Sequence, residues 1–491
     1  MTLKSIVKGS SVYVIGDLIR RSISFLLLPF YTRFLTPSDY GLLEILDLAI
    51  MITALVFGIS ASGDAMIRVY HDQTSESDRG SVVSTMMWLV FGLGTIVSAA
   101  GMFCAKEVSL LLLHSDRTRL VQLAFFTMAF GGVTELLMLY QQVRKRHLVW
   151  VCCSLAQTLG LVALNIYFIA GRGMGIWGFL FSKCIVFVLS AAILLVVTIR
   201  ETSWRFRWPI ARDLAIFGGP LILSSLATFS IHFSDRFFVN KYCSLADLGI
   251  YALAYKIGML VSVLVAGPFG AVWNANFYAE LKNGGWRGQF SRTLFYFSAV
   301  SAFVVLALSV FARPLLSIAV TPAYWGAIAI VPVVALSYGL RSIGDFFRGI
   351  LFITRRSKLF SAICAICAAF NLVLNALLIP SHGIAGAAWA TLLTWAIYLV
   401  ACFWFAHREN PIPVAPVPYL SLFGVTAGFI LVSQWVTQTP VAGQLLLAAT
   451  LLALFIIGLF VSGGVSRSDR EFVFTYVYTG RMRIAEAIRG R

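Results

Sequence analysis

The sequence predicts an all-α integral membrane protein with 14 transmembrane helices, 12 of which form two copies of a six-helix repeat. Of its 491 residues, 59% are apolar and only 12% are charged, about half the ~25% that is usual in soluble domains. A soluble chain of this composition could not cover its surface with polar groups, which excludes soluble enzymes, nucleic-acid-binding domains and disordered proteins. The apolar residues also form separate runs of about 20 residues, the length that an α-helix needs to cross a bilayer.

The apolar runs follow one another along the chain and are separated by short polar or Pro-rich stretches. Six precede a basic stretch that contains Arg200 and Arg212, six lie between this stretch and a Pro-rich linker at 411–418, and two follow the linker. The predicted spans are 9–34, 39–64, 82–104, 118–143, 148–170, 175–199, 213–238, 247–273, 290–312, 324–350, 358–380, 383–406, 419–437 and 443–463.

Short motifs recur at nearly constant offsets and indicate an internal repeat. Two of them recur 208 residues later: Asp39-Tyr40-Gly41-Leu42 as Asp247-Leu248-Gly249-Ile250, and Gly175-Ile176-Trp177-Gly178 as Gly383-Ile384-Ala385-Gly386. The basic pair Lys145-Arg146 has its counterpart 210 residues later, at Arg355-Arg356. Two independent motifs at one offset are the signature of a repeated structural unit.

The repeat predicts two lobes, helices 1–6 at 1–205 and helices 7–12 at 206–410, followed by helices 13–14 at 411–465 and a basic cytoplasmic tail at 466–491. Because six is even, both lobes enter the membrane from the same side. The repeat is therefore parallel, with an axis along the membrane normal and a substrate path between the lobes.

The distribution of basic residues predicts the orientation in the membrane. The loops on the same side as both termini hold about three times as many Lys and Arg residues as the opposite loops. We therefore expect both termini in the cytoplasm, and the net charge of +17 then reflects cytoplasmic loops rather than nucleic-acid binding.

Charged residues inside the predicted spans are informative, because each costs ~2.5–3.5 kcal/mol at the bilayer centre unless it faces water or a partner. The basic ones predict a water-filled cavity that binds an anion: Arg20, Arg21, Lys183, Lys256, Arg341 and Arg348. The acidic ones are candidates either for charge partners or for a site of a coupling ion: Asp17, Glu44, Asp47, Glu135 and Asp345.

Spacing singles out some of these residues. Arg341, Asp345 and Arg348 are spaced i, i+4, i+7 and form one polar stripe on a helix, and Asp17 and Arg20 share a face. Glu44 and Asp47 have no basic neighbour on their own helix, so one of them could titrate.

Several charges also have a simpler interpretation. Lys183 and Lys256 lie near enough to helix ends for their ammonium groups to reach the headgroups. Arg348 and the pair Asp235-Arg236 lie near predicted helix ends and could be interfacial.

Other motifs carry no chemistry of their own. Gly173–Gly178 matches G-x-G-x-x-G, but it lacks a βαβ unit and the acidic residue of a dinucleotide site, and it is interpreted as a turn that opens a helix. Cys364 and Cys367 have redox spacing, but no His or polar group accompanies them, so core packing is expected. No metal or organic cofactor is expected, and the only expected ion is a coupling H⁺ or Na⁺.

The segment Leu28–Gly41 (LPFYTRFLTPSDYG) resembles the end of helix 1 and the following loop in polysaccharide biosynthesis membrane proteins. These are the O-antigen and exopolysaccharide flippases of the multidrug/oligosaccharidyl-lipid/polysaccharide exporter superfamily. The parallel repeat, the two extra C-terminal helices and the Gly-Ile-x-Gly openings of helices 6 and 12 agree with this family over nearly the whole chain.

The resemblance implies a V-shaped, MATE-like transporter of the bacterial inner membrane that moves an undecaprenyl-pyrophosphate-linked oligosaccharide to the outer leaflet. It further implies an arginine-rich cavity, a proton or sodium gradient as the driving force, and polymerase and chain-length proteins of the pathway as partners. Three alternatives stay open. A multidrug exporter of the same superfamily would need an acidic pocket, whereas the bases in the central spans match or exceed the acids. A membrane glycosyltransferase or polymerase of the same pathway usually has a large loop, whereas no loop predicted here exceeds about twenty residues, and a scaffold without transport gives no reason for charges inside the bilayer.

Overall fold

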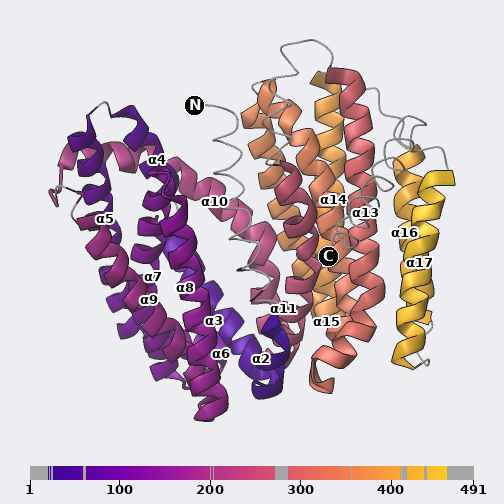
Figure 1. Ribbon diagram of the computed structural model, residues 1–491, viewed down its shortest axis with the longest axis horizontal. Helices are drawn as coiled ribbons and strands as arrows, with labels where there is room; N and C mark the ends of the chain where they lie inside the picture. The colour runs from indigo at the N-terminus through magenta and orange to yellow at the C-terminus, as the bar shows by residue number, and fades with distance from the viewer. Residues whose placement is uncertain are drawn as a thin grey trace, which may run out of the picture. The chain divides into compact units, whose positions relative to one another are not determined.

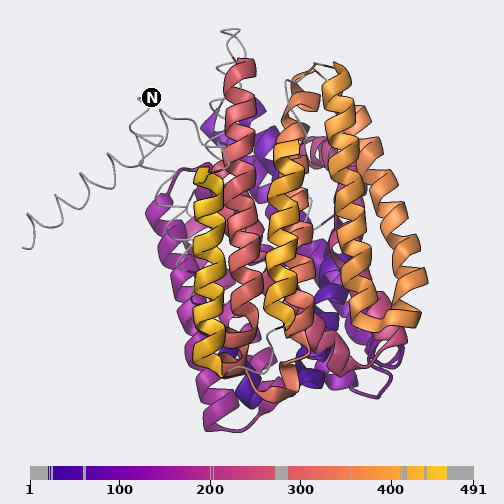
Figure 2. The same cartoon turned by 90° about the vertical axis from the view of Figure 1, so that its right-hand side faces the viewer.

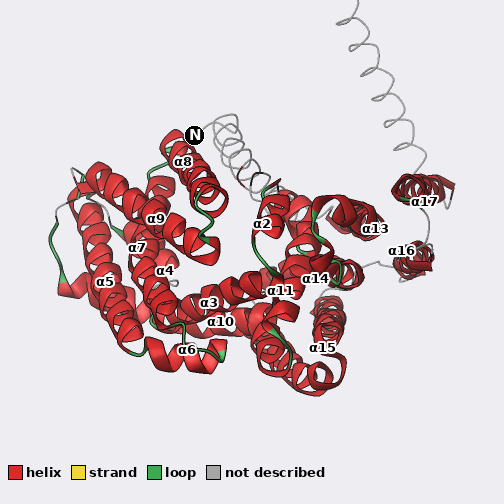
Figure 3. Ribbon diagram, turned by 90° about the horizontal axis from the view of Figure 1, so that it is seen from below, coloured by secondary structure: helices red, strands yellow, loops and turns green. Residues whose placement is uncertain are grey.

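A computed structural model shows helices and connecting segments, with no strand in the part of the chain that it describes (Figures 1 and 3). Ten of the described helices are long and apolar enough to cross a membrane, which confirms the all-helical membrane fold. The structure describes residues 20, 23, 26–58, 62–73, 75–199, 201–202, 204–270, 286–354, 356–409, 411, 417–435 and 440–461. The tail 466–491 and most of the first predicted span lie outside these residues, so the total of 14 spans stays a prediction.

Helix packing divides the chain into two compact units. Unit 1 comprises Met1–Ala254, Ser317–Ala327 and Ser361–Thr394, and unit 2 comprises Tyr255–Leu316, Ile328–Phe360 and Trp395–Arg491. The helices α11 (Leu245–Gly258) and α15 (Ser357–Glu409) therefore contribute residues to both units. The predicted lobes, which are defined by sequence repetition, stay a prediction.

In unit 1, α7 (Thr118–Val143) packs most extensively against α5 (Glu76–Phe103) and α9 (Gly175–Ile199). Polar side chains join α7 to α9: Thr134 Oγ1 donates to Phe187 O at 3.2 Å, a hydrogen bond of the kind that holds membrane helices together. Unit 1 also contains α2 (Leu28–Phe34), α3 (Pro37–Val56), α4 (Ser62–Asp72), α6 (Ala105–Leu113), α8 (His147–Asn165), η1 (Ile166–Gly171), α10 (Trp208–Tyr242) and η3 (Pro322–Tyr324).

Unit 2 contains η2 (Ser262–Ala266), α14 (Ala327–Ile353), α16 (Val417–Trp435), α17 (Val441–Val461) and most of α13 (Trp286–Ala319). The helices α16 and α17 run beside each other (Figures 1 and 2). Aromatic pairs connect them to α13: the ring centroids of Phe295 and Tyr419, and those of Phe303 and Phe455, lie 6.2 Å apart.

The predicted spans agree with the helices where charges or glycines bound the apolar runs. The spans 118–143 and 175–199 match α7 and α9 at both ends. The single span 39–64 was wrong, because α3 ends at Val56 and α4 begins at Ser62. Gly58 adopts a φ of +75° just after the end of α3, a conformation that glycine provides and that ends a helix.

The motifs at 39–42 and 247–250 have the same local geometry. The amide of Asp39 donates to Thr36 Oγ1 at 3.2 Å at the start of α3, and that of Asp247 donates to Ser244 Oγ at 3.1 Å at the start of α11. In each case the aspartate carboxylate accepts a 3.1 Å hydrogen bond in return from the amide of the capping residue, which completes a reciprocal cap.

The two glycines of these motifs allow the helix starts to touch. A methyl group on Gly41 would lie 1.9 Å from Leu245 O, and one on Gly249 would lie 2.0 Å from Pro37 O. Because Pro37 and Leu245 are themselves 208 residues apart, the contact is reciprocal.

The second motif pair agrees in backbone conformation. Gly175 has a φ of +53° and Gly383 a φ of +58°, and each precedes a helical segment. The G-x-G-x-x-G match at 173–178 therefore is a turn that opens α9, as expected, and Gly383 divides the long helix α15.

Candidate functional site

The predicted intramembrane charges fall into separate groups in the two units. Arg341, Asp345 and Arg348 lie in unit 2, whereas Arg20, Asp47, Glu135 and Lys183 lie in unit 1. Lys256 is exposed on α11. Asp17 and Arg21 lie outside the described residues.

The charged residues of α14 form the predicted stripe. Arg341 Nε lies 3.7 Å from Asp345 Oδ2, and Arg348 Nη1 lies 3.3 Å from Asp345 Oδ1. The side chains of Arg341, Asp345 and Arg348 are 25%, 23% and 39% exposed, respectively. The carboxylate therefore lies between two guanidinium groups that remain accessible.

Aromatic residues hold this stripe in place. The guanidinium of Arg341 lies 5.7 Å from the ring centroid of Tyr338 and 5.1 Å from that of Trp395, which fixes its plane by cation–π contacts. Tyr398 donates a hydrogen bond to Asp345 Oδ1 at 2.8 Å.

The stripe has spare capacity for an anion. Among the described residues, the nearest acidic contact of each arginine is Asp345, so two positive charges face one negative charge. A guanidinium presents five N–H donors in a planar fork, and in each arginine a single nitrogen makes the contact with the carboxylate. An oxyanion such as a phosphate can use the remaining donors in bidentate pairs.

A cavity of about 630 Å³ lies within unit 1. Its walls come from α3, α7, α8 and α9, with Arg20 also on the lining. Of the predicted residues, it contains the bases Arg20 and Lys183 and the acids Asp47 and Glu135. Across the cavity wall, Lys183 Nζ lies 2.5 Å from Asp47 Oδ1.

Glu135 differs from the other acidic side chains. Glu135 is exposed and lines the cavity. None of the described residues makes a hydrogen bond or ion pair with its carboxylate. A carboxylate in a membrane-spanning helix without a protein partner must face water or a ligand.

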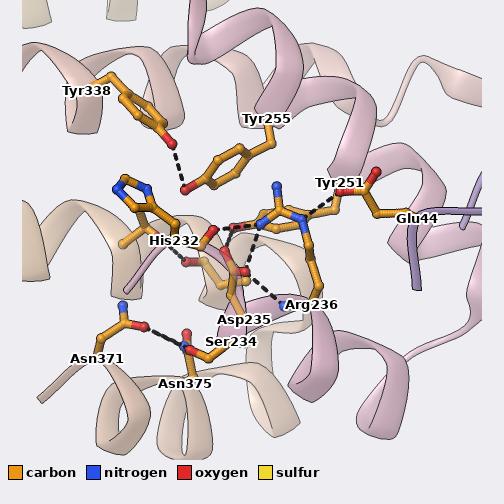
Figure 4. A network of polar contacts seen from close by, with 12 residues as sticks. Glu44, His232, Ser234, Asp235, Arg236, Tyr251, Tyr255, Tyr338, Asn371 and Asn375 are labelled. Atoms are coloured by element: carbon orange, nitrogen blue, oxygen red, sulfur yellow. Dashed lines mark hydrogen bonds and ion pairs between the residues drawn. The ribbon is translucent and has the colours of Figure 1, made fainter. Parts of the chain in front are cut away.

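The buried polar network around Arg236 was not predicted. Arg236 Nε donates to Glu44 Oε1 at 2.9 Å, and Nη1 donates to Asp235 Oδ1 at 2.9 Å (Figure 4). Tyr251 OH donates to Asp235 Oδ2 at 2.6 Å. The side chains of Asp235 and Arg236 are 1% and 3% exposed, so the interfacial interpretation of this pair was wrong.

The partners of Glu44 and Asp47 come from other helices. Glu44 of α3 meets Arg236 of α10, and Asp47 of α3 meets Lys183 of α9. The snorkelling alternative for Lys183 was therefore wrong, because its ammonium is paired inside unit 1. The burial of the Arg236 network is typical of a structural ion pair that joins two helices.

Uncharged polar residues were also missed by a search for charges. Ser234 of α10 donates to Asn371 Oδ1 at 3.3 Å (Figure 4). Asn371 Nδ2 in turn donates to Thr394 Oγ1 at 3.0 Å. Ser154 and Gln157 of α8 and Trp150 line the cavity of unit 1. Their only signal in the sequence is polarity within an otherwise apolar span.

Comparison with curated proteins finds distant relatives. An uncharacterized membrane protein of Haemophilus influenzae is 24% identical over 53% of this chain and 62% of its own length. The succinoglycan biosynthesis transport protein ExoT of Rhizobium meliloti is 21% identical over 50% of this chain and 48% of its own. The chain thus matches about half to three fifths of the length of these relatives.

A solved structure of the lipid II flippase MurJ in an inward closed conformation has a similar fold. The match covers 91% of this chain and 98% of MurJ, with a TM-score of 0.73 and 12% identity, so it concerns the fold alone. The model of the family described as "Polysaccharide biosynthesis protein" matches residues 6–274, more than half of the chain. This membrane protein therefore belongs to the polysaccharide biosynthesis protein family, as the resemblance of its Leu28–Gly41 segment predicted.

Proposed function

We propose that this protein is a flippase that moves an undecaprenyl-pyrophosphate-linked oligosaccharide from the cytoplasmic to the periplasmic leaflet. The observation that carries the proposal is the stripe of α14, in which Arg341 and Arg348 share one carboxylate and keep most of their donors available. A surplus of positive charge inside a membrane-spanning helix is costly unless an anion uses it.

A pyrophosphate suits this stripe. It carries about two to three negative charges, and guanidinium forks bind its oxygens in bidentate pairs. Arginine stays protonated at any physiological pH, so the site keeps its charge through a transport cycle. The aromatic rings beside Arg341 reduce the conformational freedom lost when the anion binds.

The names of similar proteins support the same substrate class. ExoT is a succinoglycan biosynthesis transport protein, and MurJ is a lipid II flippase. The first name describes transport in the biosynthesis of a glycan, and the second describes a flippase that acts on a lipid. We propose a lipid-linked oligosaccharide as the substrate of this protein because the arginine stripe fits the phosphate part of such a molecule.

The proposal includes the architecture and the energy source. Two six-helix lobes in a parallel repeat would alternate access in the bacterial inner membrane, with both termini cytoplasmic and a proton or sodium gradient driving the cycle. The reciprocal contact of Gly41 and Gly249 and the matching φ angles of Gly175 and Gly383 support the repeat. Polymerase and chain-length proteins of the same pathway would be partners.

Depletion of the protein tests the proposed translocation. We expect the lipid-linked oligosaccharide to accumulate on the cytoplasmic leaflet and the surface polymer to disappear. Continued appearance of the oligosaccharide on the outer leaflet would overturn the proposal. Increased drug susceptibility of the depleted cells, with normal polymer, would instead support the multidrug exporter.

A further inference from the structure

The cavity of unit 1 is too large to serve a bare ion. Its volume of about 630 Å³ lies within the ~300–1,000 Å³ that is usual for sites of organic ligands. The anion-binding stripe of α14 lies in unit 2, so the proposed phosphate site gives no role to this cavity.

The charge balance of the cavity points to a neutral ligand. Its described lining contains two bases, Arg20 and Lys183, and two acids, Asp47 and Glu135. Lys183 and Asp47 neutralise each other at 2.5 Å. In contrast to the stripe of α14, this lining offers no surplus of positive charge for a phosphate.

Two polar groups on the lining have unused hydrogen-bonding capacity. The carboxylate of Glu135 has no partner among the described residues, and Gln157 Nε2 is buried without a hydrogen-bond partner there. The buried Gln157 amide nitrogen without a partner costs about 1–3 kcal/mol, which a ligand that accepts from it recovers. Glu135 can only accept when ionised, whereas the Gln157 amide nitrogen can only donate.

Part of the remaining lining suits a sugar ring, and the rest is apolar, including Met128, Leu180 and Phe187. Ser154 adds a hydroxyl that both donates and accepts, and Trp150 adds an aromatic ring. A hexose presents many O–H groups around its edge and apolar C–H faces. Acceptors, donors and an aromatic ring around one organic-sized space match this combination better than they match a lipid tail or a phosphate.

We propose that the cavity of unit 1 binds a sugar residue of the transported molecule, with Glu135 accepting hydrogen bonds from its hydroxyls and Gln157 donating to its oxygens. This inference rests on the proposed function for the source of the sugar. The cavity would thus distinguish a lipid pyrophosphate that carries a glycan from one that does not.

Binding to the purified full-length protein in nanodiscs tests the inference. The probes are lipid-linked oligosaccharide extracted from membranes of the host bacterium and undecaprenyl pyrophosphate without sugar. We expect the wild type to bind the glycan-bearing lipid about tenfold or more tightly than the bare lipid, since one or two added hydrogen bonds with a charged group suffice for this factor. Glu135→Gln and Gln157→Ala should each reduce this preference and leave affinity for the bare lipid unchanged.

Glu107→Gln is the matched control, because Glu107 is an exposed glutamate on α6 that does not line the cavity. Melting temperatures in detergent establish that each variant is folded. Equal affinity of the wild type for both lipids, or an undiminished preference in both cavity variants, would overturn the sugar site but leave the flippase standing. Failure of the wild type to bind either lipid would reject both.

Tetraphenylphosphonium serves as a probe for the competing occupant. Tight binding of this lipophilic cation that Glu135→Gln abolishes, together with an unchanged preference for glycan, would assign the cavity to organic cations and overturn the inference.

Discussion

Glu135 of α7 and Asp345 of α14 occupy matching positions in the chain but have opposite surroundings. Each lies ten residues before a basic pair, Lys145-Arg146 in the first case and Arg355-Arg356 in the second. Asp345 lies between two guanidinium groups and accepts a hydrogen bond from Tyr398. Glu135 has none of these partners among the described residues and faces a cavity.

Two side chains account for much of this difference. At the same offset of 210 residues, the positions of Arg341 and Arg348 are taken by Gly131 and Met138, both of which line the cavity. A glycine leaves space where an arginine would fill it, and a methionine brings no charge. Matching positions of two helices can therefore belong to an arginine stripe in α14 and line an open polar cavity in α7.

The largest effect should come from disrupting the contact between the two repeated motifs, which supports the assignment of matching positions in the chain. Gly41→Ala and Gly249→Ala each place a methyl group about 2 Å from a backbone oxygen, Leu245 O or Pro37 O. Because backbone cannot move aside without shifting a helix, we expect each to destabilise the protein by more than about 3 kcal/mol, seen as a lower melting temperature and abundance.

Gly92→Ala is the control, since a methyl group there meets no atom within 4 Å. It should leave the melting temperature nearly unchanged. A large loss for only one of the two motif variants would contradict the reciprocal contact and weaken the assignment of matching positions.

The next largest effect concerns the stripe of α14. The double substitution Arg341→Ala and Arg348→Ala should reduce export of surface polysaccharide about a hundredfold or more, because it removes two charge-assisted contacts worth about 1.5–3 kcal/mol each. The measurement is surface polymer in depleted cells complemented with each variant. Arg119→Ala, which removes an exposed arginine at the start of α7, should export normally. Wild-type export by the double variant at normal abundance would remove the basis of the proposed function.

Much of the helical fold could be predicted because its signals are local. The limits of α7 and α9 coincide with charges and glycines that interrupt apolar runs, and a helix needs only its own residues to form its hydrogen bonds. The break between α3 and α4 escaped prediction, because Gly58 lies within an apolar run and its φ of +75° has no distinct signal in composition.

The site could be predicted only where its contacts are local. Arg341, Asp345 and Arg348 meet through spacing on one helix, so the sequence alone predicts the stripe. The Glu44–Arg236 and Asp47–Lys183 pairs join residues 192 and 136 positions apart, and only tertiary packing brings them together.

Placing an arginine in α7 at the position that corresponds to Arg348 would test whether such side chains explain the different surroundings of Glu135 and Asp345. Met138→Arg places a guanidinium three residues after Glu135, the spacing of Asp345 and Arg348. We expect the new ion pair to occupy the Glu135 carboxylate and part of the cavity, and to lower export about tenfold, the equivalent of 1.4 kcal/mol. Met138→Leu conserves volume without adding charge and should export normally. Equal export by both variants would contradict a role for the open cavity in transport.

The smallest expected effect comes from removing the hydrogen bond that Tyr398 donates to Asp345, which tests the role of this carboxylate apart from the two arginines. Tyr398→Phe removes the 2.8 Å hydrogen bond to Asp345 Oδ1 and leaves both guanidinium groups in place. A carboxylate that loses a neutral donor relies more on its ionic partners, so Asp345 should hold Arg341 and Arg348 more firmly and compete better with a bound anion. One hydrogen bond of about 1 kcal/mol corresponds to about a fivefold loss in the initial rate of export.

Tyr419→Phe, which removes a 3.4 Å hydrogen bond to Ser291 O between α16 and α13, provides the matched loss of a hydroxyl away from the stripe. An equal loss of export in both variants would mean that Tyr398 acts through stability alone. A loss confined to Tyr398→Phe would show that Asp345 competes with the transported anion for Arg341 and Arg348. The carboxylate of α14 would then act through the arginines of its own helix, unlike Glu135 of α7.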